Sequence, residues 1–248
     1  MIKIVDLHKS FGKQTVLDGL NLDIEDRKTT VVIGKSGGGK SVLLKHIIGL
    51  LKPDQGHVMI DDINITNLNE KDLNETRKKF GVLFQESALF DSMTVGENVA
   101  FPLREHTKMK EEEIGQTVAD RLKAVGLTGV ENKMPSELSG GMKKRVGLAR
   151  ALAMHPRIVL FDEPTTGLDP IMTEAINQLI TDTQEKFGLT CVVISHDIQS
   201  VLKIGHMIAM LYEGKIVEYG TPEKIKASKN PVVEQFLSGK IEGPIKII

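Results

Sequence analysis

The chain has 248 residues, of which 40% are hydrophobic and 26% charged, and its formal net charge is −1. This length suits one large α/β domain or two small ones, and the composition is that of a soluble globular protein. A net charge this close to zero argues against long-range steering to nucleic acid or to an anionic membrane. The absence of Trp, with aromatic residues at only 4%, also argues against a platform for stacking bases.

The single cysteine, Cys191, lies in the apolar run 190–194, where a buried small residue is favoured over a reactive thiol. The first six residues predict a strand rather than a signal peptide. No apolar run approaches the roughly 20 residues that a membrane-spanning helix needs. We therefore expect a soluble, cytoplasmic protein whose membrane role, if it has one, depends on a partner.

The first part of the chain predicts short strands around a glycine-rich loop. Alternating or β-branched residues predict strands at 2–7, 20–24, 30–33, 57–60 and 63–65. Asp18-Gly19 is typical of a hairpin turn, which leaves the start of the second strand open. A helix follows the glycine-rich loop and ends near Gly49, a turn covers 53–56, and the polar segment 68–79 favours a surface helix or loop.

The middle of the chain changes from alternating patterns to helical ones. After a strand at 81–85, Thr94 and Glu97 have the spacing of a capping box at a helix start. Apolar residues spaced by three or four predict an amphipathic helix over 110–126. Another helix is expected from 139 to 154, so that roughly 87–153 is an all-helical insertion.

Strands and helices alternate again in the last part. Strands are predicted at 157–161, 189–194, 207–212 and 215–218, and helices at 171–186 and 198–202. Asp169-Pro170, Thr221-Pro222 and Asn230-Pro231 each combine an N-cap residue with proline at the first helical position. This alternation predicts an α/β fold with a mostly parallel sheet, in which ligands bind at the carboxyl ends of strands.

The stretch Gly34-Lys35-Ser36-Gly37-Gly38-Gly39-Lys40-Ser41 fits the pattern G-x-x-x-x-G-K-[ST] between a buried strand and a helix. The glycines allow successive backbone N–H groups to face one cavity, and the helix N-terminus adds a positive dipole end. Lys40 supplies a mobile charge for outer phosphates, and Ser41 a hydroxyl for Mg²⁺. A glycine-rich turn is the alternative, but Lys40 and Ser41 in register favour a nucleoside triphosphate site.

Polar side chains follow three of the predicted strands. Asp162 would lie near Mg²⁺, and Glu163 would face the outer phosphate and deprotonate or orient a water. His196 would hydrogen-bond a phosphate oxygen or hold that water. Gln85 would reach both the metal and the water. Two solvated carboxylates and a surface histidine are the alternatives, and the phosphate loop favours the functional interpretation.

Leu138-Ser139-Gly140-Gly141 predicts a second anion-binding helix start in a chain with only one phosphate loop. A second copy of the chain would bring Ser139 over the bound nucleotide, which predicts a two-fold, head-to-tail dimer with two shared sites. An ordinary helix start with a glycine hinge is the alternative. Lys143-Lys144-Arg145 is either a solvated face or a set of charges that neutralise phosphates.

In their order and spacing these motifs, together with Gly167-Leu168-Asp169, resemble ABC-type ATPase domains over nearly the whole chain. The resemblance implies a P-loop core, an antiparallel N-terminal β subdomain and the helical insertion within one domain at 1–238, followed by a tail at 239–248. It implies ATP and Mg²⁺ as cofactors, with 139–141 clamping the γ-phosphate bound to the opposite subunit. It also implies that Gly167-Leu168-Asp169 crosses the dimer interface and that Phe11 stacks on adenine.

Met142 stands where the commonest ABC signature has Gln, and with Lys143-Lys144-Arg145 it is similar to the Mla and Mce branch, which powers lipid transport. The segments 84–90 and 101–106 and the tail around 236–239 and 243–244 also resemble that branch. An importer of another, polar solute is the alternative.

The resemblance implies a motor subunit on the cytoplasmic face of the inner membrane, docked to a permease through residues 86–106. Small regulatory and substrate-binding subunits are further expected partners, and nucleic acid is not. A DNA-repair relative would carry a long coiled coil, and a translation relative two ATPase domains, and neither is found in the sequence. A stand-alone assembly factor stays open, whereas Glu163 and His196 argue against an inactive scaffold.

Overall fold

The structure is a computed structural model that describes residues 1–246. The chain forms two compact units, one of residues 1–74 and 192–246 and the other of residues 75–191. The boundaries fall inside helix α2 (Glu70–Arg77) and strand β8 (Thr190–Ile194). Residues 239–246 of the predicted tail 239–248 belong to the first unit, and residues 247–248 lie outside the described part of the chain.

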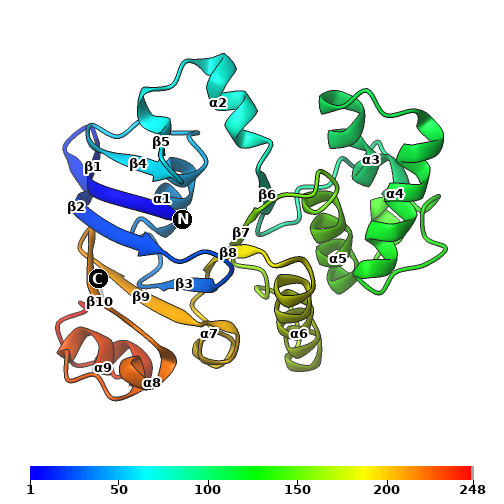
Figure 1. The fold of residues 1–248 in the computed structure, drawn as a ribbon. Helices are drawn as coiled ribbons and strands as arrows, with labels where there is room; N and C mark the ends of the chain where they lie inside the picture. The colour runs from blue at the N-terminus through cyan, green and yellow to red at the C-terminus, as the bar shows by residue number, and fades with distance from the viewer. Residues whose placement is uncertain (247–248) are drawn as a thin grey trace. The chain divides into compact units, whose positions relative to one another are not determined.

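An antiparallel sheet with strand order β2-β1-β4-β5 forms the beginning of the first unit (Figure 1). Its strands are β1 (Ile2–Phe11), β2 (Gln14–Ile24), β4 (Gln55–Ile60) and β5 (Ile63–Asn64). Alternate residues such as Ile2, Ile4 and Leu22 are buried, as expected for a sheet with one covered face. β2 runs through Asp18-Gly19 without turning, so the hairpin suggested by this pair is wrong; the chain turns between β1 and β2, where Gly12 has a φ of 60°.

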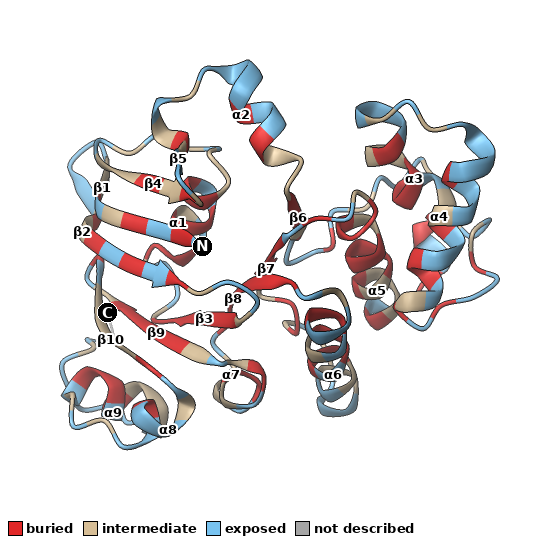
Figure 2. Ribbon diagram, in the orientation of Figure 1, coloured by how far each residue is buried: buried red, intermediate tan, exposed pale blue. Residues whose placement is uncertain are grey.

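The rest of the first unit is built on strands in the order β10-β9-β3-β8. β3 (Thr29–Ile33) pairs in parallel with β9 (Met207–Tyr212), which pairs antiparallel with β10 (Lys215–Gly220). Every residue of β3 is buried (Figure 2), as expected for a parallel strand that is covered on both faces. The further elements are α1 (Lys40–Ile47), η1 (Ile65–Asn67), α7 (Ile198–Ile204), α8 (Pro222–Lys226) and α9 (Pro231–Ser238).

In the second unit, β6 (Phe80–Leu83) and β7 (Ile158–Asp162) are neighbouring parallel strands. The N–H of Thr190 donates to the carbonyl of Arg157 over 3.0 Å, which places the start of β8 beside β7. Helix α6 (Pro170–Phe187) begins as predicted, with the Asp169 carboxylate accepting from the N–H groups of Ile171 and Met172.

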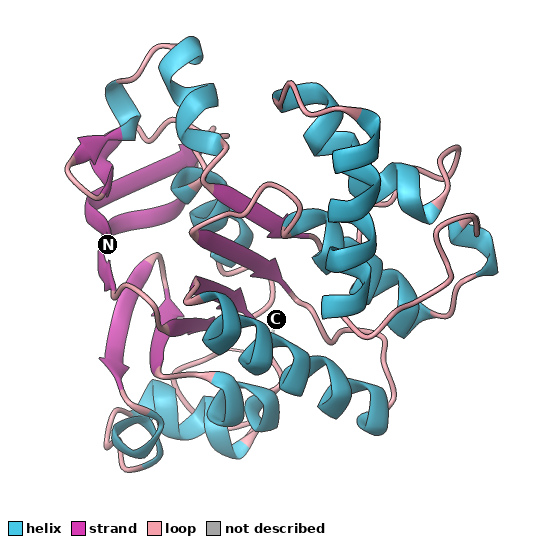
Figure 3. Cartoon of the chain, turned by 45° about the vertical axis from the view of Figure 1, so that its right-hand side comes forward, coloured by secondary structure: helices cyan, strands magenta, loops and turns pink. Residues whose placement is uncertain are grey.

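Three helices, α3 (Val95–His106), α4 (Glu111–Ala124) and α5 (Gly140–Ala151), pack against one another in the second unit (Figure 3). A short helix, η2 (Pro135–Glu137), precedes α5. The capping box of Thr94 and Glu97 is confirmed at the start of α3. The amphipathic pattern of α4 is also confirmed, since Ile114, Val118 and Leu122 are all buried.

The predicted fold class is therefore confirmed: the chain is α/β, with an antiparallel N-terminal sheet, mostly parallel strands and a helical segment. The open interpretation of 68–79 is decided in favour of a helix, α2. Within residues 1–246, every helix is too short or too polar to cross a membrane.

Candidate functional site

The glycine-rich loop 34–39 joins β3 to α1, as the sequence predicts. Gly34 has a φ of 153°, and a Cβ at this position would lie 2.3 Å from the carbonyl oxygen of Leu211 on β9. Only glycine allows this close approach. The loop ends at Gly39, which has a φ of 97° and no side chain to cap the helix. The first turn of α1 therefore presents backbone N–H groups toward the loop, which is the geometry of an anion-binding helix N-terminus.

Lys40 points back into the loop rather than out to solvent. Its side chain is buried, and its Nζ donates to the carbonyls of Gly34 and Lys35 over 2.8 and 3.0 Å. The sequence predicts a mobile charge, whereas the structure shows one held within the loop by carbonyl oxygens. An ammonium group in this place adds positive charge to a cavity already lined by N–H groups.

His196 follows β8 at the same edge of the sheet as the phosphate loop. The N–H of Ser195 donates to the carbonyl of Val32 over 3.4 Å, so the residues after β8 lie beside the end of β3. Asp197, the next residue, caps α7 through the N–H groups of Gln199 and Ser200. The structure thus brings His196 and the loop 34–41 to one sheet edge, as their strand-end positions predict.

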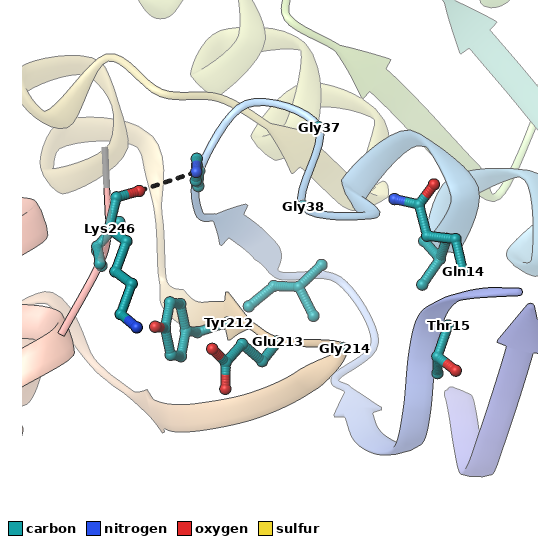
Figure 4. Close-up of a pocket in the computed structure, with 12 residues that line it drawn as sticks. Gln14, Thr15, Gly37, Gly38, Tyr212, Glu213, Gly214 and Lys246 are labelled. Carbon is teal, nitrogen blue, oxygen red and sulfur yellow. Dashed lines mark hydrogen bonds between the residues drawn. The ribbon is translucent and has the colours of Figure 1, made fainter. Parts of the chain in front are cut away.

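Phe11 lies at the turn between β1 and β2, and 48% of its surface is exposed. The Nζ of Lys9 lies 5.6 Å from the centre of its ring. A single lysine can cover only one face of the ring, so the other face of Phe11 is available for stacking with a planar group. Beyond the turn, Gln14 and Thr15 line a cavity that also reaches Gly37 and Gly38 of the phosphate loop (Figure 4).

This cavity has a volume of about 240 Å³ and a wall that the sequence did not predict. Ile245 and Lys246 of the C-terminal tail line it, and the carbonyl of Lys246 accepts from Nζ of Lys35 over 3.0 Å, drawn as a dashed line in Figure 4. The hydroxyl of Tyr212 donates to the carbonyl of Pro244 over 2.7 Å. The tail therefore lies along the phosphate loop of its own unit, and a contact between such distant residues leaves no local signal in the sequence.

In the second unit, Asp162, Glu163 and Gln85 come from neighbouring strand ends. Leu83 pairs with Phe161, so the residues that follow β6 lie beside those that follow β7. Glu163 has a φ of 50°, an uncommon left-handed conformation for a residue with a side chain. Gln85 is exposed. Two carboxylates and an amide at one sheet edge can bind a hard cation and accept a proton from water.

Ser139 caps α5 as predicted, with its Oγ accepting from the N–H of Met142 over 3.3 Å. Ser139 and Gly140 are exposed. A methyl group on Gly140 would lie 3.6 Å from Cδ2 of Leu168, so the segment Gly167-Leu168-Asp169 lies beside this helix start in the same unit. The exposed start of α5 is a second place where backbone N–H groups can meet an anion.

Of the two interpretations of Lys143-Lys144-Arg145, the solvated face is wrong for Lys144, which is 5% exposed. Its Nζ donates to the backbone carbonyl of Gln85. Burial lowers the pKa of Lys144, while Glu86, Glu163 and Asp162 oppose this shift by their charge. Arg145 donates to the carbonyl of Val125 over 2.7 Å. A run of three basic residues is usually a solvated face, and only the packing of α5 shows otherwise.

The predicted site residues are divided between the two units. The first unit holds Phe11, the loop 34–41 and His196, and the second holds Gln85, 139–141, Asp162 and Glu163. Residues 1–246 contain no cluster of three or more His, Cys, Asp or Glu that would hold a metal by itself. A hydroxyl, an amide and a carboxylate are oxygen donors that fit Mg²⁺, which takes few protein ligands when phosphates supply the others.

Comparison with known proteins agrees with this geometry. A family model described as "ABC transporter" matches residues 17–166. The "Probable ribonucleotide transport ATP-binding protein mkl" of Mycobacterium leprae is 46% identical over 244 residues, which are 98% of this chain and 70% of that protein. The "Intermembrane phospholipid transport system ATP-binding protein MlaF" of Haemophilus influenzae is 43% identical, covering 99% of this chain and 93% of that protein. The same-named protein of Escherichia coli is 41% identical, covering 99% and 91%.

Solved structures give the same assignment. The dimeric ATP-binding cassette MJ0796 bound to ADP and Pi has a TM-score of 0.82 and 35% identity, covering 90% of this chain and 99% of that chain. The protein cbiO1 from Clostridium perfringens, described as part of the ABC transporter complex cbiONQ, has a TM-score of 0.85 and 31% identity, covering 95% and 94%. The phosphate loop, the strand-end carboxylates and the relatives all point to one family. The chain therefore belongs to the ABC transporter family, as an ATP-binding subunit that hydrolyses ATP.

Proposed function

We propose that this ATPase drives phospholipid or other lipid transport between membranes through a partner permease. The observation that carries the proposal is the full-length similarity to two MlaF proteins, which extends over 99% of this chain and more than nine tenths of each relative. Met142 and the basic residues after it, which set this signature apart from the commonest ABC form, support the same branch.

The residues divide the work of hydrolysis between binding and proton transfer. The loop 34–41 binds the phosphates through its N–H groups and Lys40, and Phe11 stacks on adenine. Ser41, Asp162 and Gln85 hold Mg²⁺, which supplies positive charge to the phosphates when bound. Glu163 accepts a proton from the attacking water, and His196 donates a hydrogen bond at the outer phosphate.

The second half of each site comes from another copy of the chain. The exposed start of α5, at 139–141, is supported in this role by its open N–H groups and by the neighbouring segment 167–169. Two similar structures of MJ0796 are described as dimeric, which supports a homodimer. In the head-to-tail arrangement each copy covers the nucleotide of the other, so nucleotide binding favours closure and hydrolysis reopens the dimer.

The permease docks near residues 86–106, on the cytoplasmic face of the inner membrane. Phe90 is 41% exposed, and its ring centre lies 4.9 Å from that of Phe101 on α3. An aromatic pair near Gln85, of which Phe90 is exposed and Phe101 half-buried, favours an apolar partner surface. Small regulatory and substrate-binding subunits complete the proposed assembly, in which residues 1–238 form the ATPase domain with the helical insertion at 87–153.

Ribonucleotide transport is a second candidate, because the mkl proteins are 46% identical to this chain and carry that name. The two candidates differ in cargo, not in the chemistry of the ATPase. Lipid is favoured because the chain spans 91–93% of the MlaF proteins and 68–70% of the mkl proteins.

The test is to purify the tagged chain from membranes in mild detergent and to identify its partner chains and bound small molecules by mass spectrometry. We expect co-purified integral membrane subunits with phospholipid bound, and ATPase activity that phospholipid stimulates and Glu163→Gln abolishes. Bound ribonucleotide other than ATP and ADP, without lipid, would support the second candidate. A chain recovered without any membrane protein would contradict the proposal.

A further inference from the structure

Helix α5 holds the backbone of the loop that follows β6. Lys144 donates to the carbonyl of Gln85, and Arg150 donates to the carbonyls of Ser87 and Ala88 over 2.7 and 2.8 Å. These two cations lie six residues apart on α5, with Gly147 midway between them. Residues spaced by three on a helix are neighbours on its surface, so all three belong to one side of α5.

Gly147 lets the loop approach closely between the two cations. A Cβ at this position would lie 2.7 Å from Cδ1 of Leu83 and 3.3 Å from Cβ of Ser87. Ser87 is 1% exposed although it belongs to a surface loop. The loop 85–88 is therefore held at both ends by charged donors and pressed against the helix in its middle.

The loop is also held in an unfavourable backbone conformation. Ser87 and Ala88 have φ values of 61° and 45°, two successive left-handed residues of which neither is glycine. The hydroxyl of Ser87 is buried without a hydrogen-bond partner among the described residues. Strain of this kind persists only where surrounding contacts impose it, and it concentrates in segments that switch conformation. Lys144, Gly147 and Arg150 supply those contacts.

The same helix begins at Gly140, and its N-cap Ser139 lies five residues before Lys144. A 12-residue helix is stiff, so a displacement of its start is carried to the residues that hold the loop. The loop that α5 holds begins at Gln85, whose side chain is proposed to reach the metal and the attacking water.

We propose that Lys144 and Arg150 are positioning residues: they fasten the loop 85–88 to α5, so that Gln85 is placed for hydrolysis only when the start of α5 is engaged. Neither residue needs to touch the nucleotide. The inference rests on the proposed role of Gln85, and the experiment separates the two.

The experiment measures steady-state ATP hydrolysis by the full-length chain in two backgrounds, wild type and Gln85→Ala. In the wild-type background, Lys144→Ala should lower kcat about tenfold or more with little change in the KM for ATP, because a misplaced reacting group costs rate rather than binding. In the Gln85→Ala background the same substitution should add little further loss. Lys144→Arg, which keeps a charged donor, should recover part of the rate, and Lys123→Ala, an exposed lysine on α4, should match the wild type.

Hydrogen exchange of the same full-length variants provides a second readout that does not depend on activity. Lys144→Ala and Arg150→Ala should each speed backbone exchange within 85–90 while leaving α4 unchanged. Gly147→Ala should do the same without removing either cation, because the added methyl group displaces the loop.

Three results would overturn the inference. Wild-type kcat in Lys144→Ala, with Gln85→Ala impaired, would remove the positioning role and leave the role of Gln85 intact. Equal fractional losses from Lys144→Ala in both backgrounds would show that it acts independently of Gln85. Wild-type kcat in Gln85→Ala would overturn the role of Gln85 and the inference with it. Where Lys144→Ala does not fold, Lys144→Gln and the exchange data on Gly147→Ala give the same decision.

Discussion

The hydroxyl of Thr166 donates a hydrogen bond to Oε2 of Glu163 over 3.2 Å, across the turn that follows β7. Glu163 keeps its left-handed backbone in this turn. The hydrogen bond orients one carboxylate oxygen of Glu163, because hydrogen bonds to carbonyl-type oxygens are directional. A carboxylate whose oxygen is oriented in this way is suited to accept a proton from water.

Replacing Glu163 by Gln should therefore remove hydrolysis while leaving nucleotide binding intact. The amide keeps the size of the side chain but cannot take the proton, and loss of a general base costs about 100-fold or more in rate. With ATP and Mg²⁺ the variant should accumulate as a closed dimer, which size-exclusion chromatography with light scattering would detect. Glu185→Gln, an exposed residue of α6, is the matched control. A Glu163→Gln variant with wild-type turnover would remove Glu163 as the base.

Replacing Lys40 by Ala should weaken nucleotide binding. Its Nζ, which donates to two carbonyls of the loop, is the charged donor buried within the phosphate cavity. Hydrogen bonds to charged groups contribute about 1.5–3 kcal/mol, which corresponds to roughly a 10- to 100-fold increase in Kd. Titration calorimetry with ATP would measure this change, and Lys45→Ala, an exposed lysine of α1, is the control. Unchanged affinity would contradict the assignment of the loop.

The capping box of α3 predicts a pH dependence of stability. The backbone N–H of Thr94 donates to Glu97 and lowers the pKa of that carboxyl below its ordinary value of 4.5. A carboxyl whose folded pKa is depressed stabilises the fold fully above its unfolded pKa, and this contribution is lost as the pH falls through the folded pKa.

Glu97→Gln should therefore be less stable than the wild type near neutral pH, and the difference should shrink as the pH falls below 4.5. Urea unfolding of both proteins across this range would measure it. Glu112→Gln, an exposed residue of α4, should show no such change. A difference that is constant with pH would mean that the charge of Glu97 does not stabilise the helix start.

Asn98 should be the most costly polar residue to remove in the helical segment. It is fully buried, its Oδ1 accepts from the N–H of Phe90, and its Nδ2 donates to the carbonyls of Phe90, Met93 and Thr94. Asn98→Ala leaves these backbone groups without their partner, at a cost of about 2–3 kcal/mol in the free energy of unfolding. Chemical denaturation would measure the loss, with Asn132→Ala, an exposed residue, as control. A loss of less than about 0.5 kcal/mol would place Asn98 with ordinary surface positions.

Local patterns in the sequence predicted the elements that carry the site. Three of these elements depend on residues within a few positions of one another: the phosphate loop, the capping box of Thr94 and the Asp169-Pro170 helix start. A short segment of sequence is therefore enough to predict each of them. The strand-end positions of Asp162 and His196 could also be predicted, because parallel strands expose their carboxyl ends at one edge.

Tertiary structure decided what depends on distant partners. Asp18-Gly19 is typical of a turn, yet Leu17 and Leu20 on either side of it pair with β1, and the chain continues as one strand. A lysine in a run of basic residues is usually solvated, yet the packing of α5 buries Lys144 against a backbone carbonyl 59 positions away. Lys35 contacts the tail across 211 positions. Burial and long-range hydrogen bonds depend on which surfaces come into contact when the chain folds. A single sequence shows the local preferences of each segment, but it does not show which distant segments will pack together.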